Sequence, residues 1–484
     1  MQKLNKSIYE GYKQYPEKIL QFGEGNFLRA FVDWQVEKLN QEAGFQGSVV
    51  AVQPRGSEKI KTLNEQDGLY TLFLQGMKNG HPKSEHMIIS SISRGIDLFS
   101  DYQSFKKLAA EEELRFIISN TTEAGIMFNE EDRLDDKPQQ TFPGKLTAFL
   151  YFRYQAFTGN STKGCMIIPC ELIEENGRKL KEIVLKYAAL WQLEKGFTNW
   201  IHDANTFCNS LVDRIVPGFP VDTIDEITAE LGYQDDLVVV GEQYHLWVIE
   251  GPEDLKDELP FVEARLNTLI VDDLAPYRTK KVRMLNGAHT AMTPVSYLYG
   301  LDTVGETIEH EVTGRFVREL IFEEIIPTLD MEGLTEYAEE VLERFKNPFM
   351  KHYLHSIALN SVSKFTTRNL PTLAVYVRQK GHLPERLVFA LSALLYYYRG
   401  IRDGETIELQ DSPNILSFFK KVWSGPDTDM YTIASTALGE QQLWGTNLNE
   451  IPGLTKRTAF FLGMIHERGM KQALEGLYKR GEVN

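Results

Sequence analysis

The sequence has few cysteines and no apolar run long enough for a membrane span. Its three cysteines, Cys165, Cys170 and Cys208, form no C-x-x-C pair, which argues against a disulfide framework and a structural zinc site. The longest apolar stretch, residues 387–398, is too short to cross a bilayer and predicts a buried helix. Residues 1–15 contain no apolar segment, so we expect no signal peptide and a cytoplasmic protein.

Basic residues are also in short supply. The chain has 52 Lys and Arg against 68 Asp and Glu, a formal net charge of -16. The electrostatic field of this negative net charge repels phosphate backbones and anionic membranes, so neither nucleic acid nor a membrane is an expected partner. A small anionic substrate would need its own local group of Arg and Lys side chains.

The pattern of apolar residues predicts two domains. Over residues 1–275, short apolar runs alternate with amphipathic segments, as in a parallel sheet covered by helices. Over residues 276–484, apolar residues recur at helical spacing and strand signals nearly vanish. We therefore expect an α/β domain followed by an all-helical domain. The expected strands are residues 19–22, 48–52, 70–74, 87–92, 116–119, 165–168, 237–240 and 246–250.

A glycine turn follows the first expected strand and suggests a nucleotide site. Gly23-Glu24-Gly25 leads into a helix whose N-terminus could receive a pyrophosphate. The fingerprint is incomplete because Leu28 stands at its third glycine position, and an ordinary tight strand–helix turn explains the motif equally well. The candidate cofactor residues here are Phe22, Gly23, Gly25, Asn26, Phe27, Leu28 and Arg29.

Two further strand ends carry polar residues suited to a dinucleotide. Gln53 follows the second strand, where it can bind a ribose hydroxyl, but Arg55 nearby can also receive the 2′-phosphate of NADP. Asn120, Thr122 and Glu123 follow a later strand and are candidates for the nicotinamide side, although a plain helix cap accounts for them too. The residues alone leave the choice between NAD and NADP open.

Lys281, Asn286 and His289 form a candidate catalytic set. On an α-helix of about 100° per residue, Asn286 lies about 140° and His289 about 80° around from Lys281, so one broad face presents all three. A dehydrogenase without a metal needs a base and a hydrogen-bond donor for the substrate oxygen, which Lys and Asn can supply. No H-E-x-x-H motif offers a zinc site instead. The alternative is a solvated basic helix start followed by a bend.

Four motifs in order resemble the polyol-specific long-chain dehydrogenases, the mannitol dehydrogenase family. They are LQFGEGNFLRAF at 20–31, CELIEENG at 170–177, NSLVDRIVP at 209–217, and the K-x4-N-x2-H pattern of the candidate catalytic set. The resemblance covers most of the chain. It implies a Rossmann-type N-terminal domain, a helical C-terminal domain, NAD as cofactor, no metal, and a small-molecule substrate.

The same resemblance implies roles for individual residues. Lys281 is expected to be the general acid and base, Asn286 to polarise the carbonyl, and His289 to contact the substrate. Asp213 and Lys364 match substrate-contacting positions.

Three departures from the polyol-oxidising members bear on the substrate. Leu172 replaces an Asn of the oxyanion site, Ser356 replaces an Arg, and Arg278 replaces a Glu. We expect Arg278 to attract or bind a carboxylate. The residues of these motifs most resemble those of family members that reduce a keto-hexuronate, with D-tagaturonate favoured over D-fructuronate as the substrate. A sugar-phosphate dehydrogenase and a dinucleotide-binding regulator without turnover remain as alternatives.

Overall fold

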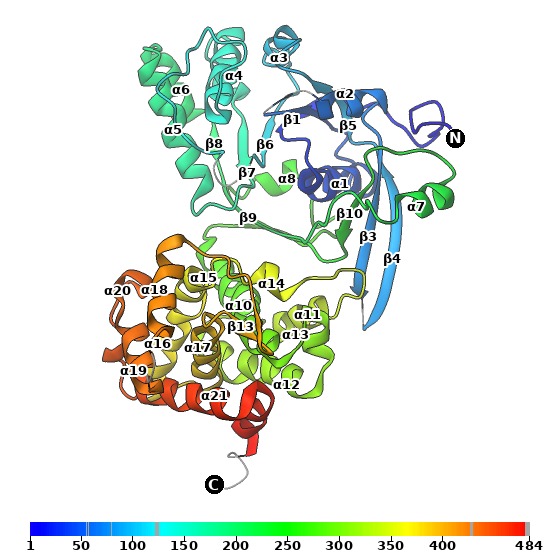
Figure 1. Cartoon of the computed structure of the whole chain (residues 1–484). Coiled ribbons are helices and arrows are strands. Elements are labelled where there is room, and N and C mark those ends of the chain that lie inside the picture. The colour runs from blue at the N-terminus through cyan, green and yellow to red at the C-terminus, as the bar shows by residue number, and fades with distance from the viewer. Residues whose placement is uncertain (55, 57, 79, 122–124, 426–428, 480–484) are drawn as a thin grey trace. The chain divides into compact units, whose positions relative to one another are not determined.

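The computed structural model describes residues 1–54, 56, 58–78, 80–121, 125–425 and 429–479. Arg55, Thr122 and Glu123, which the sequence suggested for the cofactor, lie outside the described residues. The chain divides into two compact units (Figure 1). The first comprises Met1–Gly76 with Lys83–Ala275, and the second comprises Met77–Pro82 with Pro276–Asn484.

A six-stranded parallel sheet forms the centre of the first unit. Its strands lie in the order β5-β2-β1-β6-β7-β8. This is the strand order of the Rossmann fold, which confirms the predicted fold class for this unit. The strand bounds are β1 Glu17–Phe22, β2 Ser48–Val52, β5 Ile92–Ile96, β6 Phe116–Ser119, β7 Met166–Pro169 and β8 Thr206–Phe207.

Alternating residues of this sheet enter two separate cores. Ile19 of β1 packs in the core that includes helix α1, Asn26–Glu42. Its neighbour Leu20 packs in the opposite core, because successive side chains of a strand point to opposite faces. The helices of that second core are α3 Tyr102–Leu108, α4 Phe142–Ala156, α5 Asn176–Leu190 and α6 Lys195–Asp203.

Two three-stranded sheets complete the first unit, in the orders β10-β3-β4 and β12-β11-β9. Their strands are β3 Tyr70–Lys78, β4 His81–Ile89, β9 Asn209–Asp213, β10 Val239–Glu242, β11 Leu246–Glu250 and β12 Thr268–Val271.

The predicted single strand 87–92 is wrong, because β4 ends at Ile89 and β5 begins at Ile92. Both intervening serines bind α1, although the Ser91 carbonyl also accepts the Val49 N–H of β2 at 2.8 Å. Ser90 N–H donates to Glu37 Oε2 at 2.8 Å, and Ser91 Oγ donates to the Asp33 carbonyl at 2.8 Å.

Among its described residues, the second unit is helical apart from the ends of β3 and β4 that it includes and the short hairpin of β13 Ile401–Arg402 and β14 Glu405–Thr406. Helix α17, Glu385–Tyr397, is buried from Leu387 onward, which confirms the buried helix predicted for the long apolar stretch. It packs against α10, Gly287–Tyr299, and α21, Leu454–Lys479. Among the described helices, none combines the length and the apolar character that a membrane span requires.

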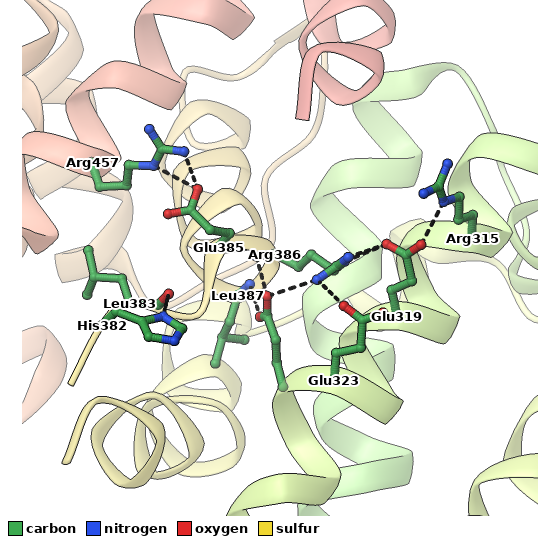
Figure 2. A network of polar contacts seen from close by, with 10 residues as sticks. Arg315, Glu319, Glu323, His382, Leu383, Glu385, Arg386, Leu387 and Arg457 are labelled. Carbon is green, nitrogen blue, oxygen red and sulfur yellow. Dashed lines mark hydrogen bonds and ion pairs between the residues drawn. The ribbon is translucent and has the colours of Figure 1, made fainter. Parts of the chain in front are cut away.

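An ion-pair group that we name the Arg386 network ties α17 to the preceding helices (Figure 2). Arg386 bonds Glu319 through Nε at 2.9 Å and reaches Glu323 at 2.9 Å and Glu324 at 3.4 Å. Glu323 and Glu324 lie on a π-helix, Leu320–Ile325. Glu324 also accepts the backbone N–H groups of residues 386 and 387, each at 2.8 Å. The network therefore neutralises Arg386 and caps the start of α17.

Candidate active site

The fold itself requires the first glycine of the Gly23-Glu24-Gly25 turn. Gly23 has φ of +131°, and a Cβ there would lie 2.7 Å from Leu28 Cδ1 and 3.2 Å from the Asn120 carbonyl oxygen. Only glycine meets both conditions without strain. The chain can then pass from β1 into α1 close against the end of β6.

Packing does not require the second glycine. Gly25 precedes α1 with ordinary extended backbone angles, and a Cβ there would project into open space. No side chain of the described residues caps the N-terminus of α1, so the first N–H groups of the helix can bind an anion, assisted by the helix dipole. A pyrophosphate that approaches the backbone would explain the glycine.

The other predicted cofactor residues of this turn divide between surface and interior. Asn26 is exposed and Phe27 half-buried, whereas Phe22, Leu28 and Arg29 are buried. The Arg29 guanidinium donates to the Glu24 carbonyl at 3.2 Å, to Asn26 Oδ1 at 2.7 Å and to the carbonyl of residue 237. Arg29 thus supports the glycine turn through these hydrogen bonds from the interior of the unit.

A cavity of about 220 Å³ lies at the carboxyl ends of β2 and β6. Pro54, Thr121, Met127, Gln140 and Phe142 are among the residues that line it. In doubly wound sheets, ligands bind at this edge, near the point where the strand order reverses. The half-buried Gln53 immediately precedes Pro54, so the cavity and the glycine turn lie at the strand ends where a dinucleotide binds.

A buried carboxyl group organises the end of β6. Glu171 accepts hydrogen bonds from the Ser119 hydroxyl at 3.0 Å and from the Thr121 N–H and hydroxyl at 2.9 and 3.0 Å. Burial raises the pKa of Glu171. Asn120 Nδ2 donates to the Cys170 carbonyl at 2.7 Å. Sequence reasoning missed this role of Glu171, although the residue lies within the CELIEENG motif at 170–177.

Two substrate-related positions of the first unit lie at strand ends. Leu172, directly after Glu171, is 61% exposed and offers no hydrogen-bond donor from its side chain. Asp213 is buried at the end of β9, where its backbone pairs with Leu246 of β11.

The catalytic candidates of the second unit lie across a π-helix, so the expectation of a continuous α-helix is wrong. Helix α9, Ala275–Lys281, is followed by the π-helix Val282–Asn286 and then directly by α10. A π-helix turns by only about 80° per residue. Asn286 therefore lies about 40–60° around from Lys281 instead of about 140°, and His289 comes almost into line with Lys281. The wider turn narrows the face that presents all three side chains.

His289 is buried, and its Nε2 has no hydrogen-bond partner among the residues that the structure describes. Its ring lies 4.3 Å from the ring of Phe345 and 5.1 Å from that of His352, measured between centroids. Burial lowers the pKa of His289 well below its usual value, and nearby positive groups lower it further. Those groups are His352, Arg344, Arg368 and Lys364.

We name these five residues the His289 cluster. Lys364 and Arg368 lie one turn apart on α15, Ser361–Arg368, which packs against α10 and the π-helix Val282–Asn286. Lys364 Nζ donates to the carbonyl of residue 357 at 2.8 Å, and Arg368 Nη1 donates to the Thr290 hydroxyl at 3.2 Å. Burial lowers the pKa of both side chains, and the charge of Arg368 lowers that of Lys364 further.

Sequence reasoning found His289 and Lys364 but missed the other three members of the cluster. The spacing of four residues between Lys364 and Arg368 was the available signal, because it places both cations on one helix face. Arg278, the predicted carboxylate contact, is half-buried on α9, and Ser356 is exposed. Among the described residues, no group of three His, Cys, Asp or Glu side chains could hold a metal ion.

Family models match both halves of the chain. The model of the mannitol dehydrogenase Rossmann domain matches residues 17–262, and that of the mannitol dehydrogenase C-terminal domain matches residues 273–462.

Curated relatives and solved structures match over nearly the full length. An altronate oxidoreductase of Bacillus subtilis (strain 168) is 71% identical over 475 residues, which cover 98% of both chains. One of Phocaeicola vulgatus is 46% identical and covers 99% of this chain and 100% of its own. A D-sorbitol dehydrogenase in substrate-free form has a TM-score of 0.81 at 23% identity, covering 96% of each chain. Pseudomonas fluorescens mannitol 2-dehydrogenase, solved with NAD and D-mannitol, has a TM-score of 0.71 at 23% identity, covering 99% of each.

Proposed function

The chain belongs to the mannitol dehydrogenase family, and on that premise we propose that it is a tagaturonate reductase, or altronate oxidoreductase. It reduces D-tagaturonate to D-altronate with NADH, and the reaction is reversible. The observation that carries the proposal is the His289 cluster, a group of buried and half-buried basic side chains suited to an anionic sugar. The 71% identity to an altronate oxidoreductase supports the same substrate.

The first unit holds the residues that fit the dinucleotide. The uncapped N-terminus of α1 after Gly25 suits the pyrophosphate. The cavity beside Pro54 and Thr121 suits the adenosine, with Gln53 placed to bind a ribose hydroxyl. When bound, NADH supplies the hydride that reduces the ketone.

The second unit supplies the proton and the polar contacts. Lys281 donates a proton to the substrate oxygen as the ketone is reduced, and takes it back in the oxidation of altronate. Asn286 donates a side-chain N–H to the same oxygen and stabilises its developing negative charge. His289 stays neutral because of its lowered pKa, so its imidazole binds the substrate as a hydrogen-bond partner without adding charge.

Further residues complete the assignment. Asp213, Arg278 and Lys364 are proposed substrate contacts, and the mechanism uses no metal. Since Leu172 has no donor, Asn286 carries more of the oxyanion stabilisation than in a site with two Asn residues. The three cysteines are free thiols, which suits a reducing compartment, and we place the enzyme in the cytoplasm.

The experiment follows NADH absorbance with purified protein and D-tagaturonate. D-fructuronate, D-fructose, a ketose phosphate and NADPH are run in parallel, each with and without a chelator. Rapid NADH oxidation with D-tagaturonate alone, unchanged by chelator, is the expected result.

Each other outcome has a defined meaning. Preference for D-fructuronate would keep the mechanism and change the substrate to the epimer. Turnover of a neutral or phosphorylated ketose without either uronate would overturn the uronate assignment. NADH binding without any turnover would indicate a dinucleotide-binding regulator.

A further inference from the structure

Arg368 is a half-buried cation for which the fold supplies no counter-charge. It ends α15, and its Nη1 donates to the Thr290 hydroxyl at 3.2 Å. Within the part of the chain that the structure describes, no carboxylate forms an ion pair with Arg368 or with Lys364. A buried charge that is not paired costs free energy. An anionic ligand at this position would offset that cost.

The guanidinium of Arg368 is held beside the catalytic segment. Its hydrogen-bond acceptor Thr290 directly follows His289 on α10. The next residue, Asn369, is buried and donates through Nδ2 to the Gly287 carbonyl at 3.0 Å. The end of α15 is therefore fastened to the start of α10, immediately after Asn286. An anion bound by Arg368 would have a fixed position relative to the proposed catalytic residues.

The neighbouring groups favour an anion at the same place. Lys364 lies one turn before Arg368 on the same helix face. His289, whose charged neighbours include both cations, has a buried Nε2 without a hydrogen-bond partner among the described residues. Arg presents a planar fork of donors that matches the two oxygens of a carboxylate, which the compact charge of Lys does not.

We propose that Arg368 binds the carboxylate of the sugar acid, with Lys364 beside it, and thereby selects uronates over neutral ketoses. This inference rests on the proposed function. It assigns the main carboxylate contact to a residue of α15, while Arg278 of α9 contributes a weaker attraction. The two arginines lie on different helices, so they can be tested separately.

The test compares Arg368→Met, Arg368→Lys, Arg278→Met and Arg378→Met with the wild type. Arg378→Met is the matched control, because it removes the same charge from an exposed position of α16, Leu370–Lys380. The measurements are kcat and KM for D-tagaturonate, the affinity for D-altronate by calorimetry, the affinity for NADH, and the rescue of Arg368→Met by added guanidinium ion.

We expect Arg368→Met to raise KM for D-tagaturonate and to weaken D-altronate binding by about 10- to 100-fold, the value of a hydrogen bond to a charged group. NADH affinity and kcat should change little. Arg368→Lys should recover part of the loss, and guanidinium should rescue Arg368→Met. Arg378→Met should behave as the wild type, and Arg278→Met should lose less than Arg368→Met.

The opposite results are equally distinct. An active wild type whose KM is unaffected by Arg368→Met would overturn this inference alone, as would a larger loss in Arg278→Met. A parallel fall of kcat, NADH affinity and melting temperature without guanidinium rescue would show a structural role for Arg368 and overturn it too. A wild type that is inactive with both D-tagaturonate and D-fructuronate would overturn the proposed function and this inference together.

Discussion

The helical unit contains two groups of basic side chains with different surroundings. In the Arg386 network, three carboxylates surround one guanidinium (Figure 2). Burial disfavours the charge of Arg386, but its hydrogen bond to Glu319 and the other carboxylates raise its pKa nonetheless. In the His289 cluster, burial and mutual repulsion lower the pKa of His289, His352 and Lys364, and the charge of Asp411 offsets only part of this effect on Lys364.

The difference separates charges that serve the fold from charges that serve a ligand. Glu324 both pairs with Arg386 and caps α17, so removal of either partner damages the scaffold. Arg368 has a hydroxyl partner but, in the described part of the chain, no carboxylate partner. The glycine turn shows the same contrast, since packing requires Gly23 and leaves Gly25 unexplained without a ligand.

The largest expected effect comes from removal of the proposed general acid. Lys281→Ala should lower kcat by about 10³-fold, within the usual contribution of a proton donor, while the affinity for NADH is kept. Stopped-flow turnover and NADH fluorescence titration measure the two quantities. Lys380→Ala, at an exposed position of α16, is the control and should retain full activity. Retained turnover in Lys281→Ala would refute the assignment.

The next largest effect tests the Arg386 network. Arg386→Met should lower the free energy of unfolding by about 3 kcal/mol, because it leaves buried Glu324 without its counter-charge. Activity per folded molecule should persist. Urea unfolding with an activity assay measures both. Arg318→Met breaks the exposed pair with Glu339 and should cost less than about 1 kcal/mol. Equal losses in both variants would remove the distinction drawn for Arg386.

A smaller effect should separate the two glycines. Gly25→Asp should weaken NADH binding by at least about tenfold, because a carboxylate at the N-terminus of α1 repels the pyrophosphate. Its melting temperature should stay near that of the wild type. Gly23→Ala should destabilise the protein by about 1 kcal/mol or more, since φ is positive there. Thermal melts with and without NADH would reveal whether the two variants behave alike, which would contradict the contrast.

The smallest effect concerns pH. Burial lowers the pKa of both His289 and His352, and the charge of Lys364 lowers both further. The pKa of His289 is also lowered by His352, Arg344 and Arg368. In the unfolded chain an imidazole takes up its proton below about pH 6.5. The stabilisation by the neutral rings is therefore full above this pH and is lost as pH falls.

Urea unfolding at pH 7.5 and 5.5 measures this loss. Between these two pH values, the wild type should lose about 1 kcal/mol more of its free energy of unfolding than His352→Gln does. The control His382→Gln, at an exposed position, should match the wild type. An identical loss in His352→Gln and the wild type would contradict the prediction.

Local sequence patterns determined much of this protein. Apolar runs located β2, β6 and β11 within their observed bounds, because buried parallel strands need continuous apolar residues. The change in the spacing of apolar residues near Pro276 separated the α/β part of the chain from the helical part. The glycine turn and the K-x4-N-x2-H pattern indicated the proposed cofactor and catalytic segments, since each needs particular residues at short spacing.

Only the tertiary structure decided which charges lie together. The π-helix after Lys281 changes the phase of its neighbours, and no apolar periodicity in the sequence announces it. Arg344, His352 and Arg368 come from three segments that converge on His289, and their sequence separation carries no information on that convergence. In the sequence, nothing in the residue type distinguishes Arg386 from Arg368. The carboxylates around one and their absence around the other, among the described residues, follow from packing of distant helices, and that packing distinguishes a structural arginine from one left for a ligand.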